Sequence, residues 1–142
     1  MNRSNRLFFV CSLTAAVSLA LVGLGGYVRA TNAGLACPDW PLCHSRVIPP
    51  FSEGVLQEFL HRVLAGFVLC LTAVLLWIAH VGRERNPYFW KTMVFLAVLV
   101  VVQAVMGGLT VIFKLNPFIV VSHLVLGTVY FQIIALSAIA NT

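Results

Sequence analysis

Residues 58–80 read EFLHRVLAGFVLCLTAVLLWIAH, and this stretch decides the fold. It is as long as the roughly 20 residues that a helix needs to cross a bilayer. Its first turns carry a carboxylate, an imidazole and a guanidinium, from Glu58, His61 and Arg62, and the rest is apolar. Ionisable side chains inside a membrane span indicate a functional site, so this helix is predicted to be more than an anchor.

The composition of the whole chain agrees with this interpretation. Of its 142 residues, 61% are hydrophobic and only 9% are charged, whereas a soluble domain has roughly a quarter of charged residues. The net charge of +5 comes from basic residues scattered at the ends of apolar runs. No basic stripe is formed, which argues against nucleic-acid binding.

Three further apolar runs have the same length scale, and one long polar segment separates the first two. We therefore expect an all-α membrane protein, a four-transmembrane-helix bundle in a single domain over residues 1–142. The helices are expected at about 7–28, 53–80, 89–113 and 118–140, with a loop at 29–52. The first run exceeds the roughly 7–15 apolar residues of a signal peptide, so we expect it to be retained.

The orientation in the cell membrane rests on the long loop. The basic residues divide almost evenly between the two sides and decide little. Cys37 and Cys43 lie close together in the loop, where a disulfide, a redox-active dithiol or a metal pair are the alternatives, with the disulfide or dithiol favoured. Disulfides persist in oxidising compartments. We therefore expect the loop outside the cell and both termini in the cytoplasm.

Two histidines carry the chemistry that the sequence suggests. His61 and His123 each lie one or two turns into a helix that runs inward, so both are expected at one depth near the outer face. Ala65, Gly66 and Gly127 lie one turn further and leave room for a wide, flat group. Two imidazoles facing each other across a bundle suit the axial ligands of a haem iron. The alternative is that each histidine bonds a neighbouring helix.

The charged residues around His61 allow two interpretations. Glu58, three residues earlier, could stabilise positive charge or take up a proton beside the ligand of His61, or it could simply favour the helix N-terminus. Arg29 and Arg62 could hold haem propionates, or they could extend to the membrane interface. A di-iron carboxylate site would need a second Glu-x-x-His motif, which the sequence lacks.

The pattern of these motifs resembles the haem A synthase family over nearly the whole chain. The resemblance lies in Gly25-Gly26-Tyr27-Val28-Arg29, the loop from Asn32 to His44 with its paired cysteines, Glu58-x-x-His61-Arg62, Gln103-x-x-x-Gly107-Gly108, and Ser122-His123-Leu124. It implies a membrane oxidoreductase that oxidises a ring methyl of haem O to a formyl group, giving haem A for a terminal oxidase. It also implies His61 and His123 as iron ligands, Glu58 as the catalytic carboxylate, and Cys37 with Cys43 as the external pair.

Members of that family usually have two such four-helix halves, and this chain corresponds to the substrate-side half. We expect a compact form that binds haem (haem b, haem O or haem A) and assembles as a homo-oligomer, a dimer or trimer. Haem O synthase and an electron carrier are possible partners within the lipid membrane. The competing hypothesis is a bis-histidine membrane cytochrome b, or a haem-handling protein, without catalysis. A structural subunit without a cofactor is the third.

Overall fold

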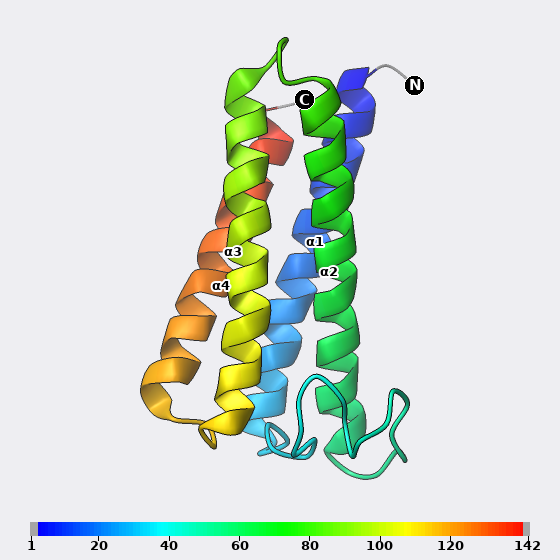
Figure 1. The fold of residues 1–142 in the computed structure, drawn as a ribbon, viewed down its shortest axis with the longest axis vertical. Coiled ribbons are helices and arrows are strands. Elements are labelled where there is room, and N and C mark those ends of the chain that lie inside the picture. Colours follow the sequence, from blue (N-terminus) through cyan, green and yellow to red (C-terminus); the bar gives the residue numbers. More distant parts are fainter. Residues whose placement is uncertain (1–2, 141–142) are drawn as a thin grey trace.

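Four long helices and one extended loop make up the computed structural model, which describes residues 3–140, with side chains from Asn5 onward. The helices are α1 (Arg3–Ala30), α2 (Val55–Val81), α3 (Pro87–Ile112) and α4 (Pro117–Ile139), as Figure 1 shows. Each is long and apolar enough to cross a membrane. Large apolar side chains are exposed along all four helices, among them Leu19, Trp77, Val98 and Leu136. The expected all-α, four-helix membrane bundle is confirmed, and the chain is a multi-pass membrane protein.

Local sequence explains where three of the helices begin. Asn86 and Asn116 each precede a proline, and their side-chain oxygens accept 3.0 Å hydrogen bonds from the backbone N–H of Phe89 and of Phe118. Asparagine before the first turn and proline within it are typical helix starts. Helix α2 begins two residues later than expected because Gly54 has a φ of 83°, outside the right-handed helical region.

The helices are arranged in a ring in the order α1, α2, α3, α4. Helix α1 packs against α2 and α4, and α3 packs against the same two, whereas the described parts of α2 and α4 face each other along a diagonal. Figure 1 shows both chain ends and the α2–α3 turn at one end, and the long loop and the α3–α4 turn at the other. We call these the terminal end and the loop end.

Most of the buried apolar residues among those described form one cluster in the half of the bundle near the terminal end. Its members come from the start of α1 and α3 and the end of α2 and α4, and include Cys11, Leu75, Met93, Leu96 and Ile134. Between α2 and α4, the hydroxyls of Thr72 and Tyr130 lie 2.5 Å apart and close this core across the diagonal. In the loop-end half, Cys37, Cys43 and Val55 form a second, smaller cluster, and both candidate histidines are half-buried side chains.

Candidate functional site

The two candidate histidines occupy equivalent places on the diagonal pair of helices. His61 is six residues from the start of α2 (61 − 55), and His123 is six residues from the start of α4 (123 − 117). At the helical rise, this places both about 9 Å below the loop-end termini. Both helices begin at the same end of the bundle, and the two imidazoles are close enough to interact electrostatically.

Each imidazole packs against a glycine of the preceding helix. A Cβ atom built on Gly25 of α1 would lie 2.9 Å from Cε1 of His61, and one built on Gly107 of α3 would lie 3.6 Å from Cε1 of His123. Each glycine is five residues from the end of its helix (30 − 25 and 112 − 107). The hairpins α1–α2 and α3–α4 therefore repeat one arrangement, a histidine held against the last turns of its partner.

The loop-end interior holds polar atoms that the protein itself leaves unpaired. Among the described side chains, four buried polar atoms have no hydrogen-bond partner: Oε1 of Gln57, Nδ1 of His61, Nε2 of Gln103 and Nδ1 of His123. All four belong to this half of the bundle. Buried polar groups are nearly always paired in native proteins, so a cluster of unpaired ones indicates a place where a ligand binds.

The distances predict that an added methyl group has different effects at the two glycines. In Gly25→Ala the new Cβ would overlap the ring of His61, so we expect weakened haem binding, with an overpacking cost of about 1–3 kcal/mol. In Gly107→Ala the contact with His123 is an ordinary van der Waals distance, so we expect little change. Haem titration of both variants measures the difference, and equal losses would contradict it.

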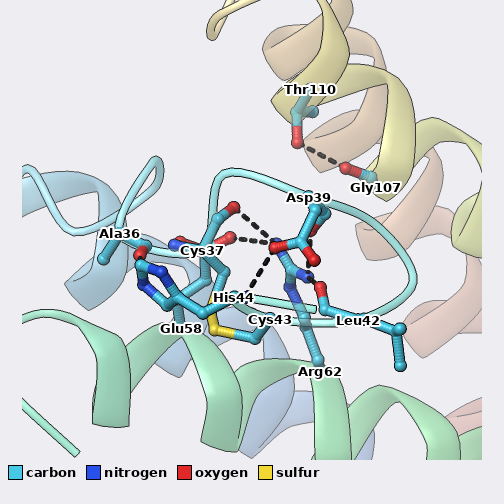
Figure 2. Close-up of polar contacts among 10 residues, drawn as sticks. All are labelled: Ala36, Cys37, Asp39, Leu42, Cys43, His44, Glu58, Arg62, Gly107 and Thr110. Atoms are coloured by element: carbon cyan, nitrogen blue, oxygen red, sulfur yellow. Dashed lines mark hydrogen bonds and ion pairs between the residues drawn. A yellow bond between two sulfur atoms is a disulfide. The ribbon is translucent and has the colours of Figure 1, made fainter. Parts of the chain in front are cut away.

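Glu58 and Arg62 form an ion pair that fixes the loop to α2 (Figure 2). The carboxylate of Glu58 is only 4% exposed and lies 2.5 Å from Nη2 of Arg62. Its second oxygen accepts a 2.8 Å hydrogen bond from the backbone N–H of Cys37. The guanidinium of Arg62 also donates to three loop carbonyls, those of Cys37, Asp39 and Leu42, at 2.6–3.1 Å.

The sequence did not predict these contacts of Arg62, and its suggested role as a partner of a haem propionate stays a prediction. The structure directs its guanidinium into the loop, where its bonds to backbone carbonyls satisfy it as a structural cross-link. The sequence contained a signal for this, because Glu58 and Arg62 stand four residues apart, the spacing at which helical ion pairs form. Arg29, the other candidate for a propionate, is exposed at the end of α1.

A disulfide between Cys37 and Cys43 closes the part of the loop that Arg62 holds. Both cysteines are buried, and Cys43 exchanges two backbone hydrogen bonds with Arg46 across a tight turn. The two residues within the turn, His44 and Ser45, have positive φ angles of 53° and 58°. Such backbone conformations cost energy outside glycine and need support from their surroundings.

Asp39 provides that support. Its carboxylate oxygens accept 2.6 Å hydrogen bonds from the backbone N–H groups of His44 and Ser45. The bond from Ser45, followed by that from His44, lowers the pKa of the Asp39 carboxyl below its usual value. His44 itself is bound within the loop, with its Nε2 2.9 Å from the carbonyl of Ala36.

Acid is therefore expected to loosen this turn. Because the pKa of Asp39 is lower in the folded loop than in an unfolded one, its bonds contribute fully above the unfolded pKa, about 4. Their contribution disappears as the pH falls through the lower, folded value. We expect Trp40 fluorescence, recorded with Trp77 and Trp90 replaced by Phe, to change below about pH 4. In Asp39→Asn that acid transition should be absent, and its persistence would contradict this role.

Trp40 closes the loop-end face in a way that the sequence did not reveal. A Cβ atom built on Gly108 of α3 would lie 2.8–3.1 Å from the indole ring of Trp40, so the loop packs directly on the backbone of the second hairpin. His80, by contrast, is exposed at the terminal end of α2, where it contacts Arg83 and Trp90 and takes no part in the site. The paired glycines of α3 thus have separate partners, His123 and Trp40.

Comparisons with known proteins point to one family. A profile of the family described as cytochrome oxidase assembly protein (COX15-CtaA) matches residues 8–57 and 50–142. The chain is 30% identical to the heme A synthase of Shewanella oneidensis over 140 residues, which cover 86% of this chain and 42% of that protein. It is 35% identical to that of Geobacillus thermodenitrificans over 113 residues, covering 75% and 33%.

A third relative, the heme A synthase of Bacillus pumilus, is 33% identical over 133 residues, covering 89% of this chain and 41% of that protein. The chain thus spans 33–42% of the length of these three relatives. No solved structure matches it. The family profile covers nearly the whole chain. The chain therefore belongs to the COX15-CtaA family of cytochrome oxidase assembly proteins.

Proposed function

We propose that this chain binds haem between His61 and His123 and acts as a haem A synthase, oxidising a ring methyl of haem O to a formyl group. The observation that carries the proposal is that two half-buried imidazoles lie at equal depth on diagonal helices, each with a buried Nδ1 that has no hydrogen-bond partner among the described residues. Its relatives are heme A synthases by name. Both findings agree with a family whose members handle haem.

The residues fit a haem. His61 and His123, from diagonal helices, are the residues that would hold the haem through its iron. The glycines behind them, Gly25 and Gly107, hold the rings without side chains of their own. The apolar core stops short of this region, so the interior of the loop-end half is where a flat macrocycle would lie. When bound, the haem would supply the iron chemistry and present the methyl group that is oxidised.

Glu58 is the residue that we assign to the reaction. It lies three residues before His61, within one turn of the imidazole and on the loop side of it. Its bonds to Arg62 and to the N–H of Cys37 hold the carboxylate as an anion in a fixed position. Oxidation of the methyl group develops positive charge, which a fixed anion one turn away stabilises, while water supplies the oxygen atom. The electrons then need an acceptor outside this site, a haem or a redox protein.

We further propose that the chain works as a homo-oligomer. One copy holds a single proposed bis-histidine site, and the electrons removed there need an acceptor outside it. A second copy in the membrane would place another bis-histidine site nearby, able to accept electrons from the first. The mass of the detergent-solubilised protein, measured by light scattering, tests this, and a monomer that retains full activity would contradict it.

The function is tested by extracting the bound haem from the purified protein and identifying it by mass, with and without co-expressed haem O synthase. With haem O available, we expect haem A or its hydroxylated intermediate in the wild-type protein. In Glu58→Gln we expect haem O to accumulate at unchanged total haem content, because the ligands remain and the anion is lost.

Two outcomes would overturn parts of this proposal. Haem B alone under both conditions would instead favour the bis-histidine cytochrome b. Full formyl production in Glu58→Gln would leave the enzyme in place but remove Glu58 from its mechanism. Gln132→Leu, a change on the exposed side of α4, serves as the control for expression and membrane insertion.

A further inference from the structure

Gln103 is a half-buried side chain whose amide nitrogen is buried, and neither the histidine pair nor the loop network uses it. It stands in the middle of α3, four residues before Gly107, which packs against His123. Its Oε1 lies 3.3 Å from where a Cβ of Gly127 would be, and Gly127 follows His123 by one turn on α4. Gln103 therefore lies between α3 and α4, about 6 Å further from the loop end than the ring of His123.

The side-chain amide of Gln103 lacks a hydrogen-bond acceptor for its N–H groups within the described part of the chain. Its Nε2 is buried and has no partner among the described residues. The neighbouring interior hydroxyls are already satisfied by bonds inside the protein, as in Thr72 with Tyr130, Ser18 with the carbonyl of Thr14, and Thr110 with that of Gly107. A buried donor left without a bond costs free energy, so an uncompensated glutamine at this depth indicates a missing acceptor.

The position of Gln103 limits which ligand group can meet it. A haem bound between the histidines has its charged propionates on one edge, and charge is expensive near the middle of a membrane. The loop end offers polar backbone and cations, whereas the terminal half offers an apolar core. The edge that faces Gln103 is therefore the uncharged one. A neutral amide, which donates and accepts, is suited to a hydroxyl group on that edge.

We propose that Gln103 is a specificity-determining residue that hydrogen-bonds an uncharged hydroxyl on the inward edge of the bound haem. This inference rests on the proposed haem site. Haem O carries such a hydroxyl on its isoprenoid-bearing substituent, and haem B has none. Gln103 would thus select for the substrate. The hydroxymethyl derivative, which forms when the ring methyl beside Glu58 is first oxidised, carries its second hydroxyl on the loop side of the histidines, away from Gln103.

The test is a comparison of haem affinities in wild type and Gln103→Leu, each prepared without haem and titrated in detergent. The titrants are haem B, haem O and the hydroxymethyl derivative of haem O. The preference of each protein is the ratio of its affinity for haem O to its affinity for haem B. The isoprenoid chain raises the affinity for haem O in both proteins, so its effect cancels when the preference of the variant is divided by that of the wild type. Gln132→Leu, an exposed glutamine on α4, is the matched control.

We expect Gln103→Leu to bind haem B as tightly as the wild type. Its preference for haem O over haem B should fall by about two- to tenfold, which is the factor contributed by one neutral hydrogen bond. A loss in the O-to-B ratio assigns the bond to the substituent hydroxyl. A loss only in the ratio of the hydroxymethyl derivative to haem O would place the bond at the oxidised ring carbon, on the side of Glu58, and would overturn the proposal. Unchanged ratios, or an equal loss for all three haems, would overturn the proposal.

The absorption spectrum recorded in the same titration separates this inference from the function on which it rests. A wild-type protein that gives no bis-imidazole spectrum with any of the three haems would overturn the proposed site itself. A bis-imidazole spectrum in both proteins with identical preferences would leave that site intact and remove only the role of Gln103.

Discussion

Replacing His61 or His123 by alanine is expected to abolish the bis-imidazole haem spectrum of the protein. In the proposed site, each change removes one of the two imidazoles that would hold the haem iron, and the other comes from the opposite helix of the diagonal. Changes to groups that only support a ligand cost about 10–100-fold in metal affinity, so loss of a ligand itself should exceed roughly 100-fold. The reduced-minus-oxidised spectrum and the haem content of purified protein measure this.

Loss of haem in these variants is not expected to reflect misfolding. Nδ1 of each imidazole has no partner within the described protein, so alanine leaves no broken hydrogen bond at that atom. The haem-free variants should therefore unfold at temperatures close to that of haem-free wild type. His80→Ala is the matched control, because His80 lies on the same helix as His61 but is exposed at the terminal end. A spectrum that survives both substitutions would show that the ligands lie elsewhere.

The second large effect is expected from Arg62→Leu, which should release the loop from α2. The change removes the partner of Glu58, a carboxylate only 4% exposed, together with the donor to three loop carbonyls. Removing one member of a buried ion pair costs about 3–5 kcal/mol, and Arg62 is partly exposed, so we expect about 3 kcal/mol. The melting temperature should fall, and a phosphine reductant should reduce the Cys37–Cys43 disulfide faster.

Two companion variants sharpen this prediction. Arg29→Leu removes an exposed guanidinium at the end of α1 and should leave both measurements unchanged. Adding Glu58→Gln to Arg62→Leu should recover part of the lost stability, since the unpaired buried charge disappears. If Arg62→Leu lowers haem affinity while reduction kinetics stay at the wild-type rate, Arg62 binds a haem carboxylate and the loop does not depend on it.

Much of the fold followed from simple features of the sequence. Four apolar runs of sufficient length required four helices, because a backbone in lipid must satisfy its hydrogen bonds within each segment. The Asn-Pro pairs at residues 86–87 and 116–117 marked the starts of α3 and α4. The start of α2 was less certain, since it depends on the backbone angle of Gly54, and that angle is set where the loop passes Ala33 and Ala36.

The candidate site was only partly predictable. The sequence placed the site residues that lie on helices, but it did not predict the contacts made by residues in the loop. The equal depth of His61 and His123 is a matter of counting residues from helix starts, which sequence patterns locate well. The contacts of Arg62 with the carbonyls of Cys37, Asp39 and Leu42 depend on how a loop of irregular backbone folds back. No periodicity describes such a loop, so the sequence did not predict these contacts.

The sequence by itself determined the number of helices and the depth of the two histidines, because these depend on local hydropathy and helical spacing. Only the tertiary structure decided that α2 and α4 lie on a diagonal, that Gly25 and Gly107 support the imidazoles, and that Nε2 of Gln103 has no partner among the described residues. These features depend on which helix faces pack together. That choice is set by side-chain fit across the whole bundle, which no single segment contains.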